Sequence, residues 1–98
     1  MSTYVILFSF TQKGVEKIKE LPARVEDAKR TIAKMGGEVI AFYAIAGSQY
    51  DTLFIVKSQS DEKLAGMALA IASLGNVRTE SHRLFNEEEV KAIVSSLP

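Results

Sequence analysis

The fold of this chain is decided mainly by residues 47–56, which read Gly-Ser-Gln-Tyr-Asp-Thr-Leu-Phe-Ile-Val. The first half is a short polar turn that carries Tyr50 and Asp51, and the second half contains the β-branched and aromatic residues that strands favour. The apolar run has no polar alternation, which is typical of a strand that is buried on both faces. We therefore expect a hairpin whose second strand, residues 51–57, is covered on both sides.

Two other segments share this two-sided apolar character. Residues 39–46 (Val-Ile-Ala-Phe-Tyr-Ala-Ile-Ala) form the first strand of the hairpin, and residues 3–11 form the strand that opens the domain. A fourth strand, residues 77–85, is more polar. An antiparallel sheet with one face in water should alternate apolar and polar residues. Because three of the four strands do not, the sequence predicts that both faces of the sheet are covered.

A helical segment separates the first two strands. Thr11 is a suitable N-cap residue, and apolar residues then recur every three or four positions as far as Met35. Pro22 lies inside this pattern, where it removes a backbone donor and crowds the preceding turn. A kink or two consecutive helices is therefore expected near residues 19–22.

Two further helices are predicted downstream. Ser60 precedes two acidic residues and begins a helix that is apolar around most of its circumference over residues 64–74. Its run of small residues, 65–72, is compatible with either a subunit contact or close packing on the sheet. Asn86 with Glu89 three residues later forms the capping-box pattern of a short closing helix.

The order of elements is βαββαβ plus a C-terminal helix, in a single domain over residues 1–98. This order predicts an α+β protein of the ferredoxin-like class, with both main helices on one face of an antiparallel sheet. A second apolar face left in water would be larger than monomers normally tolerate. We therefore expect a homodimer, or a higher homo-oligomer, in which two helix-free sheet faces pack together as a dimeric α+β barrel. The order of assembly above the dimer, and the sheet face that carries the interface, stay open.

The composition argues against several classes of partner. Twelve basic and twelve acidic side chains give a formal net charge of zero, so a nucleic-acid partner is not expected. The chain has no cysteine and one histidine, which argues against a metal centre or a cofactor and suits a cytoplasmic protein. The N-terminal apolar run is too short to span a bilayer and lacks the features of a signal peptide, so no membrane partner is expected.

Several segments together carry a family resemblance, and they extend over nearly the whole chain. They are Tyr4-Val-Ile-Leu-Phe8, Thr11-Gln-Lys-Gly14-Val15, Ala41-Phe-Tyr43, Tyr50-Asp51, Leu74-Gly-Asn-Val-Arg-Thr-Glu80 and Phe85-Asn-Glu-Glu-Glu89. With these motifs the chain resembles the GYD domain family of the dimeric α+β barrel superfamily. The resemblance implies a dimeric barrel and supplies no catalytic residues. Ser48 stands where the family has glycine, two residues before Tyr50.

A looser likeness concerns the hairpin and the fourth strand. The chain is similar there to the ligand-binding domain of leucine-responsive-type regulators, which place a Gly-x-Tyr-Asp hairpin before their third strand. Their Gly-Val-x-x-Thr stretch is resembled by residues 75–79, Gly-Asn-Val-Arg-Thr. This likeness implies that a small effector binds at a subunit interface.

Four residues are candidates for ligand binding, namely Tyr50, Asp51, Arg78 and His82. Tyr50 and Asp51 present a phenol and a carboxylate, although a turn aspartate commonly accepts backbone hydrogen bonds instead. Arg78, Glu80 and His82 share one face of the fourth strand, where Glu80 could orient His82 as a general base. The alternative is that these side chains make cross-strand or intersubunit contacts.

The sequence favours a small-molecule-binding or structural module with a cavity at the subunit interface. The alternative is a small cofactor-independent enzyme, of the monooxygenase or isomerase type, that uses the polar residues of the fourth strand. No nucleophile or acid is placed by the sequence to complete a catalytic site around His82, which makes catalysis the less favoured function. The identity of a ligand, and whether the protein is an enzyme, stay open.

Overall fold

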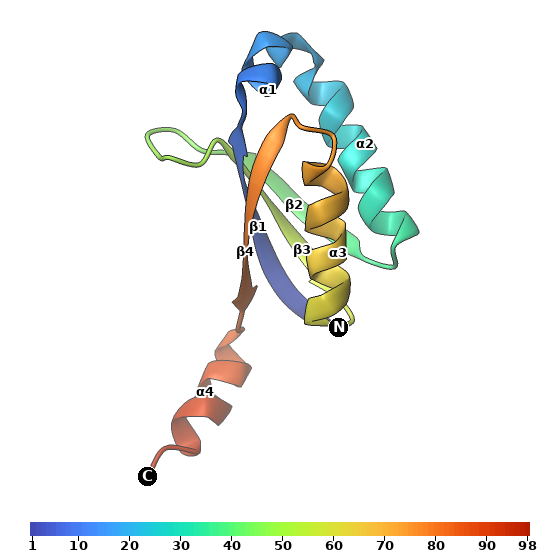
Figure 1. Ribbon diagram of the computed structural model, residues 1–98. Helices are drawn as coiled ribbons and strands as arrows, with labels where there is room; N and C mark the ends of the chain where they lie inside the picture. The colour runs from blue at the N-terminus through green and yellow to red at the C-terminus, as the bar shows by residue number, and fades with distance from the viewer.

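The computed structural model describes residues 1–98 and contains one four-stranded antiparallel sheet with strand order β2-β3-β1-β4. The helices α2 and α3 both lie on one face of this sheet (Figure 1). This arrangement confirms the expected ferredoxin-like α+β fold. In chain order the elements are β1 (Ser2–Phe10), α1 (Gln12–Glu16), the 3-10 helix η1 (Ile18–Glu20), α2 (Leu21–Lys34), β2 (Glu38–Ala44), β3 (Thr52–Ser58), α3 (Asp61–Ala72), β4 (Val77–Leu84) and α4 (Glu87–Ser95).

The helical segment after β1 breaks where the sequence predicts. The Thr11 hydroxyl caps α1 by accepting a hydrogen bond from the amide of Gly14. Helix α2 then begins afresh, with Pro22 in its first turn, where the absent N–H removes no helical hydrogen bond. The apolar residues expected from Val15 to Met35 pack against the sheet only within α2. Val15 and Ile18, in the turns before α2, are exposed.

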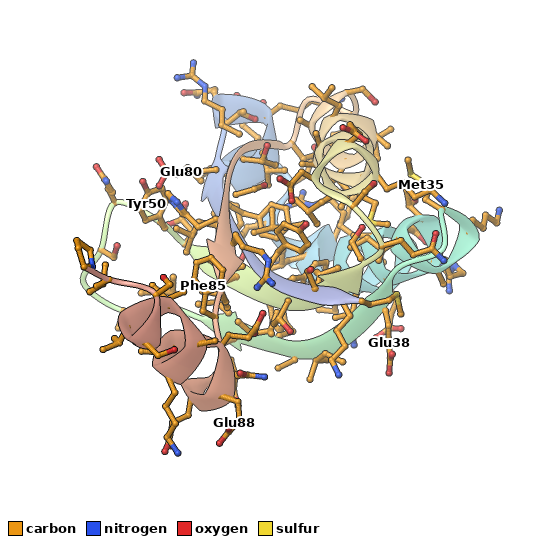
Figure 2. All side chains as sticks on the ribbon, turned by 90° about the horizontal axis from the view of Figure 1, so that it is seen from below. Met35, Glu38, Tyr50, Glu80, Phe85 and Glu88 are labelled. Carbon is orange, nitrogen blue, oxygen red and sulfur yellow. The ribbon has the colours of Figure 1, made fainter.

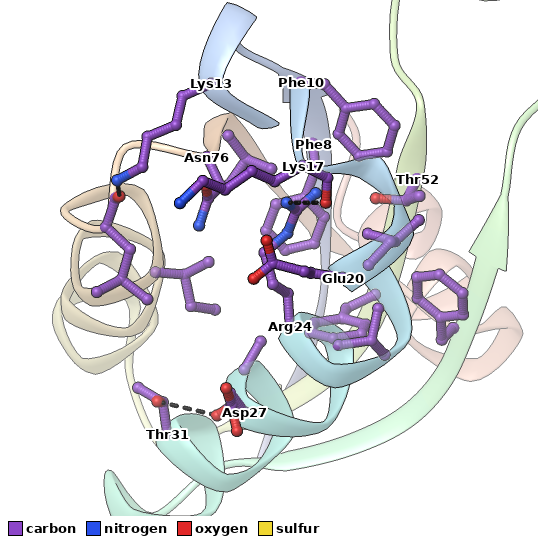
Figure 3. A pocket seen from close by; sticks show the side chains of 18 residues that line it. Phe8, Phe10, Lys13, Lys17, Glu20, Arg24, Asp27, Thr31, Thr52 and Asn76 are labelled. Carbon is purple, nitrogen blue, oxygen red and sulfur yellow. Dashed lines mark hydrogen bonds between the residues drawn. The ribbon is translucent and has the colours of Figure 1, made fainter. Parts of the chain in front are cut away.

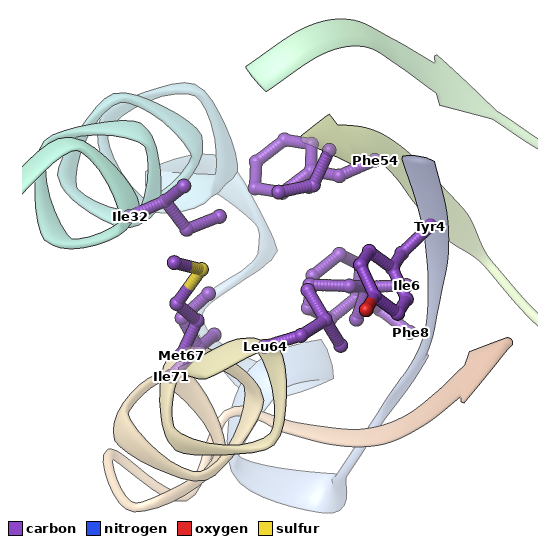
Figure 4. Packing of buried hydrophobic residues seen from close by; sticks show 9 residues of the cluster. Tyr4, Ile6, Phe8, Ile32, Phe54, Leu64, Met67 and Ile71 are labelled. Carbon is purple, nitrogen blue, oxygen red and sulfur yellow. The ribbon is translucent and has the colours of Figure 1, made fainter. Parts of the chain in front are cut away.

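The hydrophobic core lies between the sheet and the helices α2 and α3 (Figure 4). Alternate residues of β1 face this core, and the ring of Phe54 in β3 packs edge-to-face against Phe8 and Phe42 at 5.3 and 5.7 Å. The buried residues of the cluster are Tyr4, Ile6, Phe8, Ile32, Phe54, Val56, Leu64, Met67 and Ile71.

Gly14 allows a close approach between the start of α1 and the start of β4. A Cβ atom at this position would lie 2.2 Å from the carbonyl oxygen of Asn76. The amide of Thr11 donates a 3.0 Å hydrogen bond to the same oxygen. A side chain larger than hydrogen would therefore push α1 away from the sheet.

No helix covers the opposite face of the sheet. Val5 and Leu7 of β1 point to this face, and their register partners Ile55 and Leu53 in β3 do the same. A bulge at Ile40 in β2 then places Ala41 and Tyr43 opposite Ile55 and Leu53. We call this surface the helix-free face; it is apolar across β1, β2 and β3, as the sequence predicts.

Helix α4 projects away from the rest of the domain beyond the end of β4 (Figure 1). Its start has the expected capping box: the amide of Glu89 donates a 2.8 Å hydrogen bond to the Asn86 side chain, and the amide of Asn86 donates a 3.0 Å bond to the Glu89 carboxylate. A 2.7 Å ion pair between Arg83 and Glu89 ties the helix to β4. The large apolar side chains of α4 and of the residues just after it remain between 44% and 64% exposed, and they are Val90, Ile93, Val94 and Leu97.

Viewed from below in Figure 2, α4 lies on the side of the sheet away from α2 and α3. The helix-free face and the apolar side of α4 are therefore presented in the same half of the molecule. None of the helices is both long and apolar enough to cross a lipid bilayer.

Candidate functional site

The hairpin loop between β2 and β3 uses Asp51 to hold the end of β1. The Asp51 carboxylate accepts a 2.8 Å hydrogen bond from the amide of Phe10. The backbone of Asp51 adds two bonds of 2.8 Å, one donated to the carbonyl of Phe8 and one accepted from the amide of Ile45. In each of these hydrogen bonds the partner of Asp51 is a backbone group of another segment. The geometry therefore supports the structural alternative for this residue.

Asp51→Ala is expected to lower the free energy of unfolding by roughly 1 to 2 kcal/mol, because the amide of Phe10 loses its partly buried acceptor. Asp51→Asn is the matched control, since its amide oxygen can still accept this bond, and it should lose less. Thermal and urea unfolding measure both variants. If the alanine variant unfolds as the wild type does, the carboxylate has no structural role.

Tyr50, next to Asp51, belongs to a different set of contacts. Its phenol interacts with the carboxylate of Glu80 in β4, and Figure 2 shows both labelled side chains near one another. The second contact of Glu80 is with His82, whose Nε2 atom lies 2.7 Å from Glu80 Oε2. We refer to these three residues as the Tyr50–Glu80–His82 cluster.

The cluster is organised around the negative charge of Glu80. The interaction with the Glu80 carboxylate is the main cause that raises the pKa of Tyr50, and partial desolvation acts in the same direction. The interactions with Tyr50 and then with His82 lower the pKa of Glu80, because they favour its ionised form. The ionised form of Glu80 is thus favoured by both neighbours. Solvent reaches the side chains of Glu80 and His82, which are 47% and 55% exposed.

Chemically, the cluster offers a carboxylate, an imidazole and a phenol to a bound molecule. A histidine that is hydrogen-bonded to a carboxylate can accept or donate a proton. Side chains of this kind can also recognise polar groups of a ligand by hydrogen bonding alone. The cluster borders the helix-free face, because Glu80 and His82 pair in register with Leu7 and Val5.

The structure brings only two of the four candidate residues together. Tyr50 and His82 come together through Glu80, whereas the Asp51 carboxylate is directed to backbone. Arg78 pairs in register with Ser9, so it lies on the same face as Glu80 and His82, and its guanidinium makes no hydrogen bond or ion pair within the chain. Sequence reasoning identified Glu80 as the partner of His82 from strand alternation. It missed the Tyr50–Glu80 contact, which depends on how the hairpin loop lies against β4.

Comparison with known families settles the relationship of this chain. The family model described as GYD domain matches residues 4–94, nearly the full length. The chain belongs to the GYD domain family. The resemblance inferred from the sequence motifs is thereby confirmed.

One relative of this GYD domain protein is the glutamine synthetase and cystathionine beta-lyase binding protein of Thermus thermophilus. It is 30% identical over 80 residues, which are 81% of this chain and 83% of the relative. A solved structure of a similar protein from the same organism has a TM-score of 0.56 at 26% identity. The match covers 88% of this chain and 95% of that one.

The looser likeness to leucine-responsive-type regulators is also confirmed, at the level of the fold. The leucine response regulatory protein of Mycobacterium tuberculosis superposes with a TM-score of 0.64 at 22% identity over 87% of this chain. The GYD domain protein spans about half of the length of such regulators, 51% in this case. The shared part is the α+β domain.

Proposed function

We propose that this GYD domain protein is a homodimeric binding module. Two helix-free faces meet in the dimer, and the Tyr50–Glu80–His82 cluster of each subunit borders the enclosed space, where a small molecule binds. The observation that carries this proposal is the location of a polar, hydrogen-bonded cluster beside a sheet face that is apolar and uncovered. Binding sites typically combine an apolar wall with a few convergent polar groups.

The dimer is supported by two surfaces that lack a partner within one chain. The first is the helix-free face, and the second is the apolar side of the projecting α4. A stable interface of standard size buries about 800 Å² on each partner. A sheet face of four strands together with a docked helix offers a surface of this order. In the proposed dimer α4 packs on the second copy, because its own domain leaves Val90, Ile93 and Val94 between 44% and 58% exposed.

The ligand is proposed from the groups that the cluster presents. The carboxylate of Glu80 accepts hydrogen bonds, so the ligand carries a donor such as an amine or a hydroxyl group. Arg78, on the same face and without a partner, favours an anionic group on the ligand. A small polar molecule with both kinds of group fits these residues.

Native mass spectrometry of the purified protein tests this function. We expect a dimer that retains a small molecule, and we expect the double variant Arg78→Gln/His82→Gln to remain a dimer and lose most of that mass. Arg30→Gln on α2 is the matched control for loss of a surface cation, and it should retain the ligand. A dimer of unliganded mass, or a bound mass that the double variant keeps, would contradict the site.

A second candidate function is binding to a metabolic enzyme, and the similarity to the Thermus thermophilus binding protein favours it. The helix-free face or the exposed side of α4 would then contact the enzyme. Size-exclusion chromatography with purified glutamine synthetase and cystathionine beta-lyase separates the two candidates. Co-elution with either enzyme supports this second function, and separate elution together with a retained small molecule supports the first.

A further inference from the structure

A second candidate binding site lies on the helix side of the sheet, away from the Tyr50–Glu80–His82 cluster. A cavity of about 310 Å³ opens between α2, the end of α3 and the sheet, below the turn formed by α1 and η1 (Figure 3). Ligand sites in proteins are typically about 300 to 1,000 Å³, so this cavity suits a small molecule. Its apolar walls include Phe8, Phe54, Val25, Ile71 and Val77.

The rim of the cavity is cationic. Lys13, Lys17 and Arg24 lie around it, and Figure 3 shows all three side chains at its edge. Lys13 and Arg24 donate hydrogen bonds to backbone carbonyl oxygens, which leave their positive charges unneutralised. The amine of Lys17 makes no hydrogen bond or ion pair within the chain, so it is free to meet a ligand.

Two carboxylates also line the rim, Glu20 and Asp27. Asp27 forms an ion pair with Arg30, so the negative charge of Asp27 is neutralised by that cation. Three cations therefore face one unpaired carboxylate. The rim has a positive surplus, which favours an anionic group at the opening of the cavity.

An unpartnered hydroxyl group lies inside the cavity. Thr52 is only 4% exposed and forms part of the wall, and its side chain makes no hydrogen bond to the protein. Figure 3 shows this hydroxyl directed toward the cavity. No protein group occupies this hydroxyl, so it is available to a polar atom of a ligand. Thr52 is a buried residue and Lys17 is exposed, so the Thr52 hydroxyl and the Lys17 amine would contact different parts of that ligand.

We propose that this cavity binds small apolar carboxylates. The hydrocarbon or aromatic body lies against Phe8, Phe54 and Ile71, and the carboxylate lies at the rim beside Lys17. The hydroxyl of Thr52 hydrogen-bonds a polar substituent at the buried end of the body. This site uses the face of the sheet opposite to the cluster, so it is independent of the function proposed above.

Isothermal titration of the full chain with phenylacetate and phenethylamine tests the charge preference. These probes have the same aromatic body and opposite charges. We expect phenylacetate to bind about tenfold more tightly, because a charge-assisted contact to the rim exists only for the anion. Equal affinity of the two probes, or no binding of phenylacetate at millimolar concentration, would overturn the proposal.

Lys17→Gln should weaken phenylacetate binding by about fivefold to tenfold without a change in melting temperature, because the side-chain amine of Lys17 has no partner within the protein. Lys19→Gln is the matched control, since Lys19 belongs to the same 3-10 turn and does not line the cavity. The control should bind as the wild type does. An equal loss in both variants, or no loss in Lys17→Gln, would contradict the role of the rim.

Thr52→Val tests the buried end of the site with 4-hydroxyphenylacetate. In the wild type this probe should bind about fivefold more tightly than phenylacetate, because its hydroxyl meets that of Thr52. The valine variant should lose this difference and keep its affinity for phenylacetate. A melting temperature equal to or above that of the wild type shows that the variant is folded. Persistence of the difference in the folded variant would refute the contact.

Discussion

Phe8→Asp is expected to prevent the chain from folding. Phe8 is 4% exposed, and its ring packs edge-to-face on Phe54 at the centre of the core. Truncation of a buried phenylalanine alone costs about 3 to 5 kcal/mol, and the aspartate adds an unpaired carboxylate to an apolar site. A domain of this size has a total stability of only about 5 to 15 kcal/mol. Far-UV circular dichroism and the fraction recovered in the supernatant measure the outcome.

Phe8→Leu is the control for this substitution. It removes the aromatic contact and introduces no charge, so we expect a folded protein with a lowered melting temperature. A cooperative unfolding transition of Phe8→Asp near that of the wild type would show that Phe8 does not face the core.

Leu7→Asp, one residue earlier, is expected to yield a folded monomer. Leu7 points to the helix-free face, opposite Leu53 in β3 and Glu80 in β4. Burial of two such faces is worth well over ten kcal/mol of apolar transfer energy before association costs, at about 25 cal/mol per Å². An aspartate at the centre of this surface has no cation directly opposite it and adds to the charge of Glu80. It should therefore weaken the dimer far more than it weakens the subunit.

Light scattering coupled to size-exclusion chromatography at micromolar concentration measures this effect. The wild type should have the mass of a dimer, and Leu7→Asp should have half of it with an unchanged circular dichroism spectrum. Leu69→Asp is the matched control, because Leu69 is 70% exposed on α3 and lies outside the helix-free face. If only Leu69→Asp dissociates the dimer, the interface lies on α3, and a monomeric wild type would refute the dimer itself.

The different outcomes expected for Phe8 and Leu7 follow from strand geometry, and that part of the structure was predictable from the sequence. Side chains alternate along a strand, so adjacent residues of β1 face the core and the helix-free face in turn. The break before α2 and the capping box of α4 were predictable because each depends on a few consecutive residues. Pro22 determines the first, and Asn86 with Glu89 determines the second.

Contacts between distant segments could not be derived in this way. The turn motif Tyr50-Asp51 was visible in the sequence, yet its two side chains serve different elements: Tyr50 contacts Glu80 in β4, and Asp51 binds the backbone of Phe10 in β1. The exposure of Val15 and Ile18 is a similar case, because helical periodicity does not show that the α1–η1 turn rises off the sheet.

The sequence by itself determined the order of elements, the ferredoxin-like class and the apolar character of both sheet faces. These properties follow from hydrophobic periodicity and from local hydrogen bonding by capping residues. Only the tertiary structure decided that Glu80 joins Tyr50 to His82 and that Lys17 and Thr52 share one cavity. The physical reason is that these positions depend on how strands and helices pack across the whole chain, and packing is a property of the assembled core.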